Sequence, residues 1–179
     1  EMMNKTKQEP KKERLAKSLS RIQAQVTRGI KLVRDLNKLA HLPDELHRKT
    51  DLQELLTLMS DLCLRLARLK EIELCLEPFP SKPIKVKTSP FYISMAFYYT
   101  LDACLNILCP GSNIKLGVWH GKNSGGWEIK PHDSNQEQKN IISEIYSTPQ
   151  WTIANRAMKI AQGRARINDL SIVFEVPFL

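Results

Sequence analysis

The chain has few of the features that mark a membrane, zinc or disulfide protein. None of its apolar runs reaches the roughly eighteen residues that a transmembrane helix needs. Its four cysteines include no Cys-x-x-Cys pair, and no histidine lies at metal-ligand spacing from them. These absences exclude a spanning helix and a zinc finger within this sequence. Cys63, Cys75 and Cys104 lie inside apolar patterns, which predicts free thiols in a reducing cytosol.

Basic charge is concentrated in the first fifty residues. The net charge is +8, and residues 1–50 carry +7 of it. A basic arm can bind nucleic acid or acidic lipid, but this one contains no Phe, Tyr or Trp on which bases could stack. We therefore expect a solvated helix face and no specific nucleic acid partner. A structural or nucleic-acid-binding module stays open as an alternative, which salt-sensitive retention of DNA would favour.

A heptad-like seam through residues 14–41 predicts a long helix that packs lengthwise against another helix. Apolar or small residues recur at alternating spacings of four and three: Leu15, Leu19, Ile22, Val26, Gly29, Val33, Leu36 and Ala40. One helix cannot bury such a seam alone, so we expect a homodimer. The expected interface consists of Leu19, Ile22, Val26, Gly29, Val33 and Leu36. The alternative is that the helix folds back onto its own chain.

The most structured pattern lies between Ser89 and Pro131. Residues 89–108 carry apolar side chains at helical spacing and are followed by Cys109-Pro110-Gly111, a sequence that ends a helix. Ile114, Leu116 and Val118 then alternate with other residues as in a half-buried strand. We expect residues 123–126 to form a hairpin loop before a second strand.

The flanking patterns predict an α+β domain. We expect helices over residues 52–69 and 149–162, short strands over 71–76 and 84–87, and a last strand over 171–177. Residues 42–50 have the composition of a linker. This divides the chain into a basic segment with a dimerisation-type helix and linker (1–50) and a second domain (51–179).

This order of elements resembles the transmitter of sensor histidine kinases, in which a dimerisation helix precedes an ATPase domain of the GHKL type. The residues that carry the resemblance are SRIQAQVTRGIKLVRDLNKLAHLPDELHRKTDLQELL, FYYTLDACLNILCPGS and IAQGRARINDLSIVFEVPFL. The resemblance implies a two-layer sandwich of an antiparallel-rich sheet and helices, preceded by a bundle-forming helix. It also implies a cytoplasmic bacterial two-component protein, with membrane contact only through segments upstream of residue 1.

The residues that the family uses for nucleotide are largely replaced. The family's magnesium-binding Asn corresponds to Ala103, which has no oxygen ligand to offer. Asp102 is retained beside it, and Asn106, one helical turn further on, is a candidate for a shifted ligand. We therefore expect no protein ligand for a metal at the family's position.

Two further motifs are altered. The Asp that the family uses to hold adenine corresponds to Asp133, but both glycines that follow it in the family are missing. The alternative for Asp133 is a surface loop residue without a ligand. Where the family's glycines cradle phosphate, this chain has Pro149-Gln150-Trp151-Thr152. Asp102, Asn106 and Asp133 are thus candidate remnants of a degenerate nucleotide site.

The resemblance implies signalling by dimerisation and by docking of a response regulator's receiver domain. None of the four histidines stands where the family's phosphoacceptor does. We expect no cofactor; ATP and Mg²⁺ are the cofactors if the site works. The alternative is an active ATP-dependent histidine kinase or phosphotransferase in a phosphorelay, with its phosphoacceptor upstream of residue 1.

Overall fold

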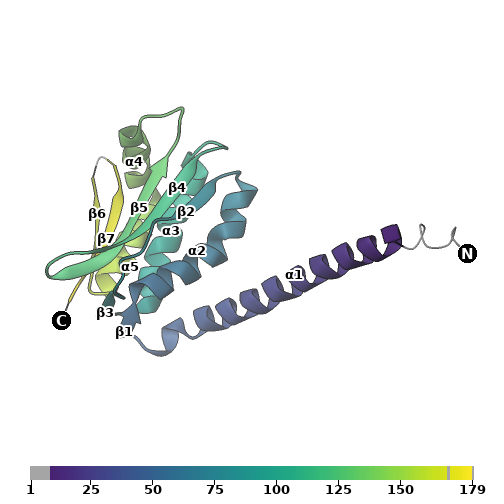
Figure 1. The fold of residues 1–179 in the computed structure, drawn as a ribbon. Helices are drawn as coiled ribbons and strands as arrows, with labels where there is room; N and C mark the ends of the chain where they lie inside the picture. Colours follow the sequence, from purple (N-terminus) through teal and green to yellow (C-terminus); the bar gives the residue numbers. More distant parts are fainter. Residues whose placement is uncertain (1–8, 169, 179) are drawn as a thin grey trace, which may run out of the picture. The chain divides into compact units, whose positions relative to one another are not determined.

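The computed structural model describes residues 9–168 and 170–178, which divide into two compact units (Figure 1). The first unit ends at Leu39 and the second begins at Ala40. Helix α1 (Glu9–Ala40) has 32 residues and begins five residues before the start expected from the seam. Among the described residues, no helix combines the length and the apolar character that crossing a bilayer requires.

The apolar seam of α1 is open. Leu19, Ile22 and Val26 are 54%, 58% and 55% exposed, and a side chain at Gly29 would meet nothing within 4 Å. Within the first unit, the described residues form no second helix or strand that could cover them. The homodimer stays a prediction, and its expected interface is free of contacts within its own unit.

The second unit contains the remaining helices and strands. In chain order they are η1 (Leu42–Asp44), β1 (Arg48–Asp51), α2 (Leu52–Leu69), β2 (Glu73–Leu76), β3 (Lys85–Thr88), α3 (Pro90–Ile107), β4 (Asn113–His120), β5 (Ser124–His132), α4 (Gln138–Tyr146), α5 (Pro149–Ile160), β6 (Arg164–Ile167) and β7 (Ile172–Pro177).

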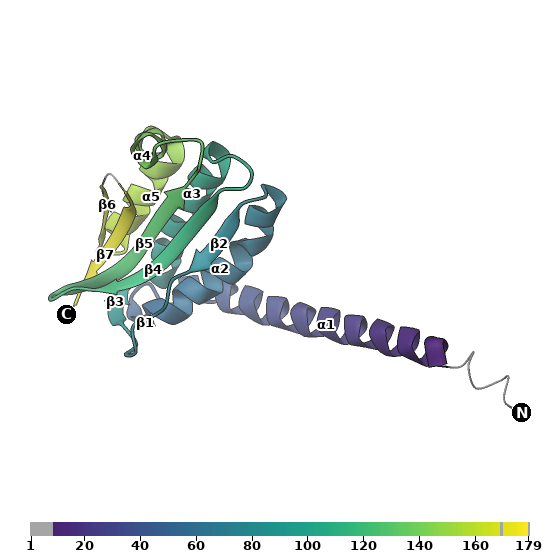
Figure 2. The same ribbon diagram turned by 45° about the horizontal axis from the view of Figure 1, so that its top comes forward.

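Five strands form one mixed sheet in the order β2-β4-β5-β7-β6. Only the β2–β4 pair is parallel. Helices α2, α3 and α5 cover one face of the sheet in both views (Figures 1 and 2). Trp127, Phe97 and Phe174 are the largest fully buried side chains between the layers, and the Trp127 ring meets Phe97 edge-on at 5.6 Å between centroids. The expected α+β two-layer sandwich is confirmed.

Two local expectations differ from the structure. Within residues 42–50, expected as a linker, lie η1 and most of β1, and β1 pairs antiparallel with β3 as a separate two-stranded sheet. Gly125 and Gly126, expected in the hairpin loop, lie inside β5. A Cβ on Gly126 would stand 1.7 Å from the carbonyl oxygen of Phe174, so β5 and β7 approach closely only because this residue is glycine.

Candidate functional site

The three positions that correspond to the family's nucleotide motifs lie on α3, on the loop after β5 and at the start of α5. Ala103 is on α3, Asp133 directly follows β5, and Pro149 is the first residue of α5. α3 and α5 pack against each other within the helix layer. A nucleotide site of the family's kind would therefore have to open between these elements.

The middle of α3 is closed by packing. Ala103 is 1% exposed, and its methyl group offers no oxygen ligand to an ion. Asp102 is half-buried, and its Oδ2 accepts a hydrogen bond from Nε2 of Gln150 at 3.1 Å. This bond joins α3 to the first turn of α5 and uses one oxygen of the Asp102 carboxylate.

Asn106 lies toward the end of α2. Its Oδ1 accepts a hydrogen bond from Nζ of Lys70 at 3.4 Å. Asp102 and Asn106 line a hollow of about 150 Å³ between α2 and α3, together with the mostly apolar Leu66, Leu69, Lys70, Tyr98, Leu101 and Leu105. The structure brings these two candidates together, but against α2.

Asp133 is not a surface loop residue, which corrects the alternative weighed for it. It is 2% exposed, and its Oδ1 accepts from the backbone N–H of Asn135 at 2.8 Å while Oδ2 accepts from that of Cys109 at 2.9 Å. These two N–H groups lower the pKa of its carboxyl from 3.8 to about 2. Both oxygens are therefore used in joining the loop after β5 to the end of α3, where the family would present a free oxygen to adenine.

The start of α5 is also occupied. Pro149 has no N–H, and the N–H of Trp151 donates to Oγ1 of Thr148, the N-cap, at 3.1 Å. The Trp151 side chain is 6% exposed, and its ring lies 6.2 Å from that of Tyr146 in α4. Two of the amides that a helix start can offer to phosphate are thus missing or capped.

No alternative catalytic centre stands out in the part of the chain that the structure describes. Its histidine, cysteine, aspartate and glutamate side chains form no group of three or more that could hold a metal ion. Burial raises the pKa of the Cys63 thiol to about 11 and that of Cys104 to about 12, so neither is an activated nucleophile.

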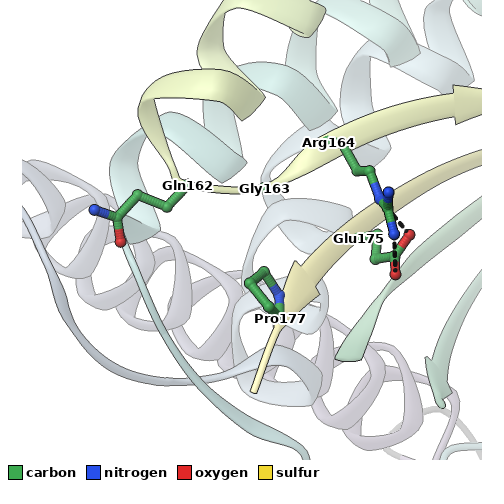
Figure 3. A pocket seen from close by; sticks show the side chains of 5 residues that line it. All are labelled: Gln162, Gly163, Arg164, Glu175 and Pro177. Carbon is green, nitrogen blue, oxygen red and sulfur yellow. Dashed lines mark hydrogen bonds and ion pairs between the residues drawn. The ribbon is translucent and has the colours of Figure 1, made fainter. Parts of the chain in front are cut away.

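Sequence reasoning missed an ion-pair cluster around the buried Glu175 of β7, whose pair with Arg164 of β6 is drawn in Figure 3. Glu175 accepts from Oγ of Ser124 at 2.7 Å and from Nε of Arg164 at 2.9 Å, and it also pairs with Arg166. Glu175 lines a hollow of about 200 Å³ together with Gln162, Gly163, Arg164 and Pro177. The Gln162 side chain points away from the Arg164–Glu175 pair. Because the Glu175 carboxylate contacts Ser124 of β5 and both arginines of β6, the cluster holds these strands to β7 at the edge of the sheet. Its only sequence signal is an acidic residue within an otherwise apolar strand.

The second unit has the fold of the ATP-binding domain of sensor histidine kinases, which confirms the resemblance. The sequence matches no family model and no curated protein. Histidine kinase AdeS of Acinetobacter baumannii matches with a TM-score of 0.59 at 11% identity, over 89% of this chain and 83% of that chain. The ATP binding domain of PrrB from Mycobacterium tuberculosis matches with 0.58 at 14%, over 75% and 99%.

A third match is to histidine kinase ThkA, solved in complex with the response regulator protein TrrA. Its TM-score is 0.56 at 15% identity, over 92% of this chain and 52% of that chain. At these identities the likeness concerns the fold, and the chemistry has to be judged from the residues present in this chain.

Proposed function

We propose that this chain is a transmitter of a two-component signalling protein whose nucleotide site has degenerated. In this proposal it acts in the cytoplasm through contacts: α1 dimerises, and the dimer docks the receiver domain of a response regulator. It needs no cofactor for this role. The observation that carries the proposal is that the protein's own groups occupy all three nucleotide positions.

Each occupied position removes one class of contact. Ala103 offers no ligand to magnesium, the Asp133 oxygens are bonded to backbone, and Pro149 together with the capped Trp151 N–H leaves few amides for phosphate. Losing a hydrogen bond to a charged group costs on the order of 1.5–3 kcal/mol. Two such losses together weaken binding by about a hundredfold or more, because each 1.4 kcal/mol is about tenfold.

Docking of a receiver domain has independent support from the complex of ThkA, a protein of the same fold, with a response regulator. The experiment is to titrate purified receiver domains from the source organism against the full chain by fluorescence anisotropy, with and without Mg-ATP. We expect at least one domain to bind with a micromolar Kd that Mg-ATP leaves unchanged. Absence of binding by every domain, or binding only with Mg-ATP, would contradict the proposal.

The alternative, an active kinase or phosphotransferase, predicts a different outcome in a parallel assay. Incubation with γ-labelled ATP would transfer label to the chain itself or to a receiver domain. We expect no label above that of a heat-denatured control.

A further inference from the structure

The two-stranded sheet of β1 and β3 has a strongly basic outer face. Lys49 stands directly opposite Lys87, and Asp51 opposite Lys85. Thr50 and Val86 are buried on the inner face, whereas the three lysines are exposed. Like charges directly opposite each other destabilise a strand pair, so this arrangement carries a cost that folding alone does not explain.

A hollow of about 380 Å³ lies beside this basic face. It is lined by Lys49, Pro83, Ile84, Lys85, His120 and Phe178. Its lining is mixed, and the buried Ile84 and the half-buried Phe178 lie against Gly125 of β5. A Cβ there would stand 2.7 Å from Cγ2 of Ile84 and 3.2 Å from the Phe178 ring. The ring of His120 lies beside that of Phe178, with 4.9 Å between centroids.

The lysines of this face lack carboxylate partners within the described chain. The nearest acidic residue in register, Asp51, accepts from the backbone N–H groups of Gln53 and Glu54 at 2.9 and 3.3 Å as the N-cap of α2. Its charge is therefore directed to the helix start.

The large sheet shows the opposite pattern. Lys130 is paired with Glu77 and Glu128, and Arg164 and Arg166 are paired with Glu175. The large sheet also holds a like-charge pair, since Lys115 stands opposite Lys130, but Lys130 has two carboxylates beside it. The lysine pair on the small sheet has none among the described residues. This contrast within one unit marks the outer face of β1 and β3 as a surface suited to an anion.

We propose that Lys49, Lys85, Lys87 and the adjoining hollow form a docking site for an acidic segment of a partner protein that carries an apolar side chain. The lysines pair with the segment's carboxylates, and the hollow takes the apolar group against the half-buried Phe178 ring. The proposal does not rest on the proposed function. The site lies at the end of β5 that begins with Ser124, and Asp133 follows the other end. The nine residues of β5 separate them by about 30 Å at ~3.3 Å per residue.

Other polyanions fit less well. The Phe178 ring is flanked by His120, so it does not present an open face for a base. Ile84 is 3% exposed and lies beneath the lysines, so it cannot insert into a bilayer. A protein segment fits both the lysines and the hollow, because it can carry carboxylate side chains and an apolar side chain a few ångströms apart.

The test uses the full chain and a fluorescent octapeptide with one central Phe flanked by Glu and Asp. We expect saturable binding that weakens with salt. Lys49→Glu with Lys87→Glu should weaken it at least tenfold, because like charges across an interface repel. Replacing the peptide's Phe by Gly should weaken it several-fold. The matched control is Lys159→Glu on α5, which is exposed and should change the Kd by less than twofold.

Three results would overturn the proposal, provided that circular dichroism shows each variant folded. One is equal weakening by Lys159→Glu, which would indicate general charge attraction. The second is insensitivity to the peptide's Phe, which would leave the hollow without a role. The third is tighter binding of single-stranded DNA, or of vesicles rich in phosphatidylserine, through the same two lysines.

Discussion

Asp133 illustrates how a single carboxylate can change from a binding group to a structural one. Its oxygens accept from Asn135 and Cys109, and the N–H groups of these residues, in that order, lower its pKa to about 2. A carboxyl whose pKa is lower when folded contributes stability above its unfolded pKa of 3.8. That contribution is lost as the pH falls through about 4 toward 2.

We expect Asp133→Ala to lower the free energy of unfolding by about 2–3 kcal/mol at pH 7, since two charge-assisted hydrogen bonds are lost. The difference from the wild type should shrink below pH 4. Urea denaturation at both pH values measures it. Glu144→Gln on the exposed side of α4 is the control, and it should cost less than about 0.5 kcal/mol. Equal effects of the two variants would show that Asp133 is not structural.

The four thiols should differ in reactivity. Cys63 and Cys104 are buried, and burial raises the pKa of both. Cys75 and Cys109 are partly exposed, and the Asp133 carboxylate raises the pKa of Cys109 through a hydrogen bond. With a disulfide reagent at pH 8, we expect two thiols to react in the native protein and all four in urea. Rapid reaction of all four without urea would contradict the described core.

At the scale of single elements, a substitution at Gly126 tests the close contact between β5 and β7. An added methyl group would collide with the Phe174 carbonyl, so we expect Gly126→Ala to lower the free energy of unfolding by about 1–3 kcal/mol. The same change at Gly29, where nothing lies within 4 Å, should leave unfolding of the second unit unchanged. Thermal denaturation followed by near-ultraviolet circular dichroism measures both variants.

The seam of α1 is tested by introducing charge. Replacing Ile22 and Val26 by Asp places carboxylates in the expected interface, where burial without partners is costly. We expect the dimer dissociation constant to rise at least tenfold in sedimentation equilibrium. Ala24→Asp with Thr27→Asp adds the same charge away from the seam and should have little effect. A wild-type chain that is monomeric at high micromolar concentration would refute the dimer.

Sequence patterns were sufficient for the long elements and insufficient for those defined by distant partners. α3 and the turn after it follow from helical spacing and from Gly111, which has a positive φ of 88°. β1 is polar throughout and forms because β3, more than thirty residues away, pairs with it. Likewise, the helix expected over 149–162 ends at Ile160, and Gln162 takes the left-handed conformation after it. Gly163 is needed because the Glu175 carbonyl lies 2.5 Å from where its Cβ would be.

In the candidate site, too, positions along the chain could be predicted from the sequence, whereas contacts between distant residues could not. Sequence indicates that Asp102, Asn106 and Asp133 stand near the family's positions, because these depend on order along the chain. It cannot indicate that Gln150 bonds Asp102 from 48 residues away, or that Asp133 bonds the Cys109 amide from 24 residues away. Whether a retained residue is free to bind depends on such contacts, which only the folded chain reveals.

At the scale of the whole molecule, a histidine kinase fold is combined with an exposed helical seam, and we propose that its nucleotide site is degenerate. The core of the second unit is formed by α3, α5 and the sheet. In the proposed function, contacts rather than phosphate transfer transmit the signal. This is the central claim, and it depends on whether Mg-ATP binds.

The most direct measurement is the unfolding temperature of the chain with and without millimolar Mg-ATP, beside an active histidine kinase domain as positive control. A ligand present at 100 times its Kd stabilises the native state by about 2.7 kcal/mol, which raises the midpoint by several degrees. We predict no shift for this chain and a clear shift for the control. A shift of several degrees that is lost on Asp102→Ala, in a variant that remains folded, would contradict the claim and restore a working nucleotide site.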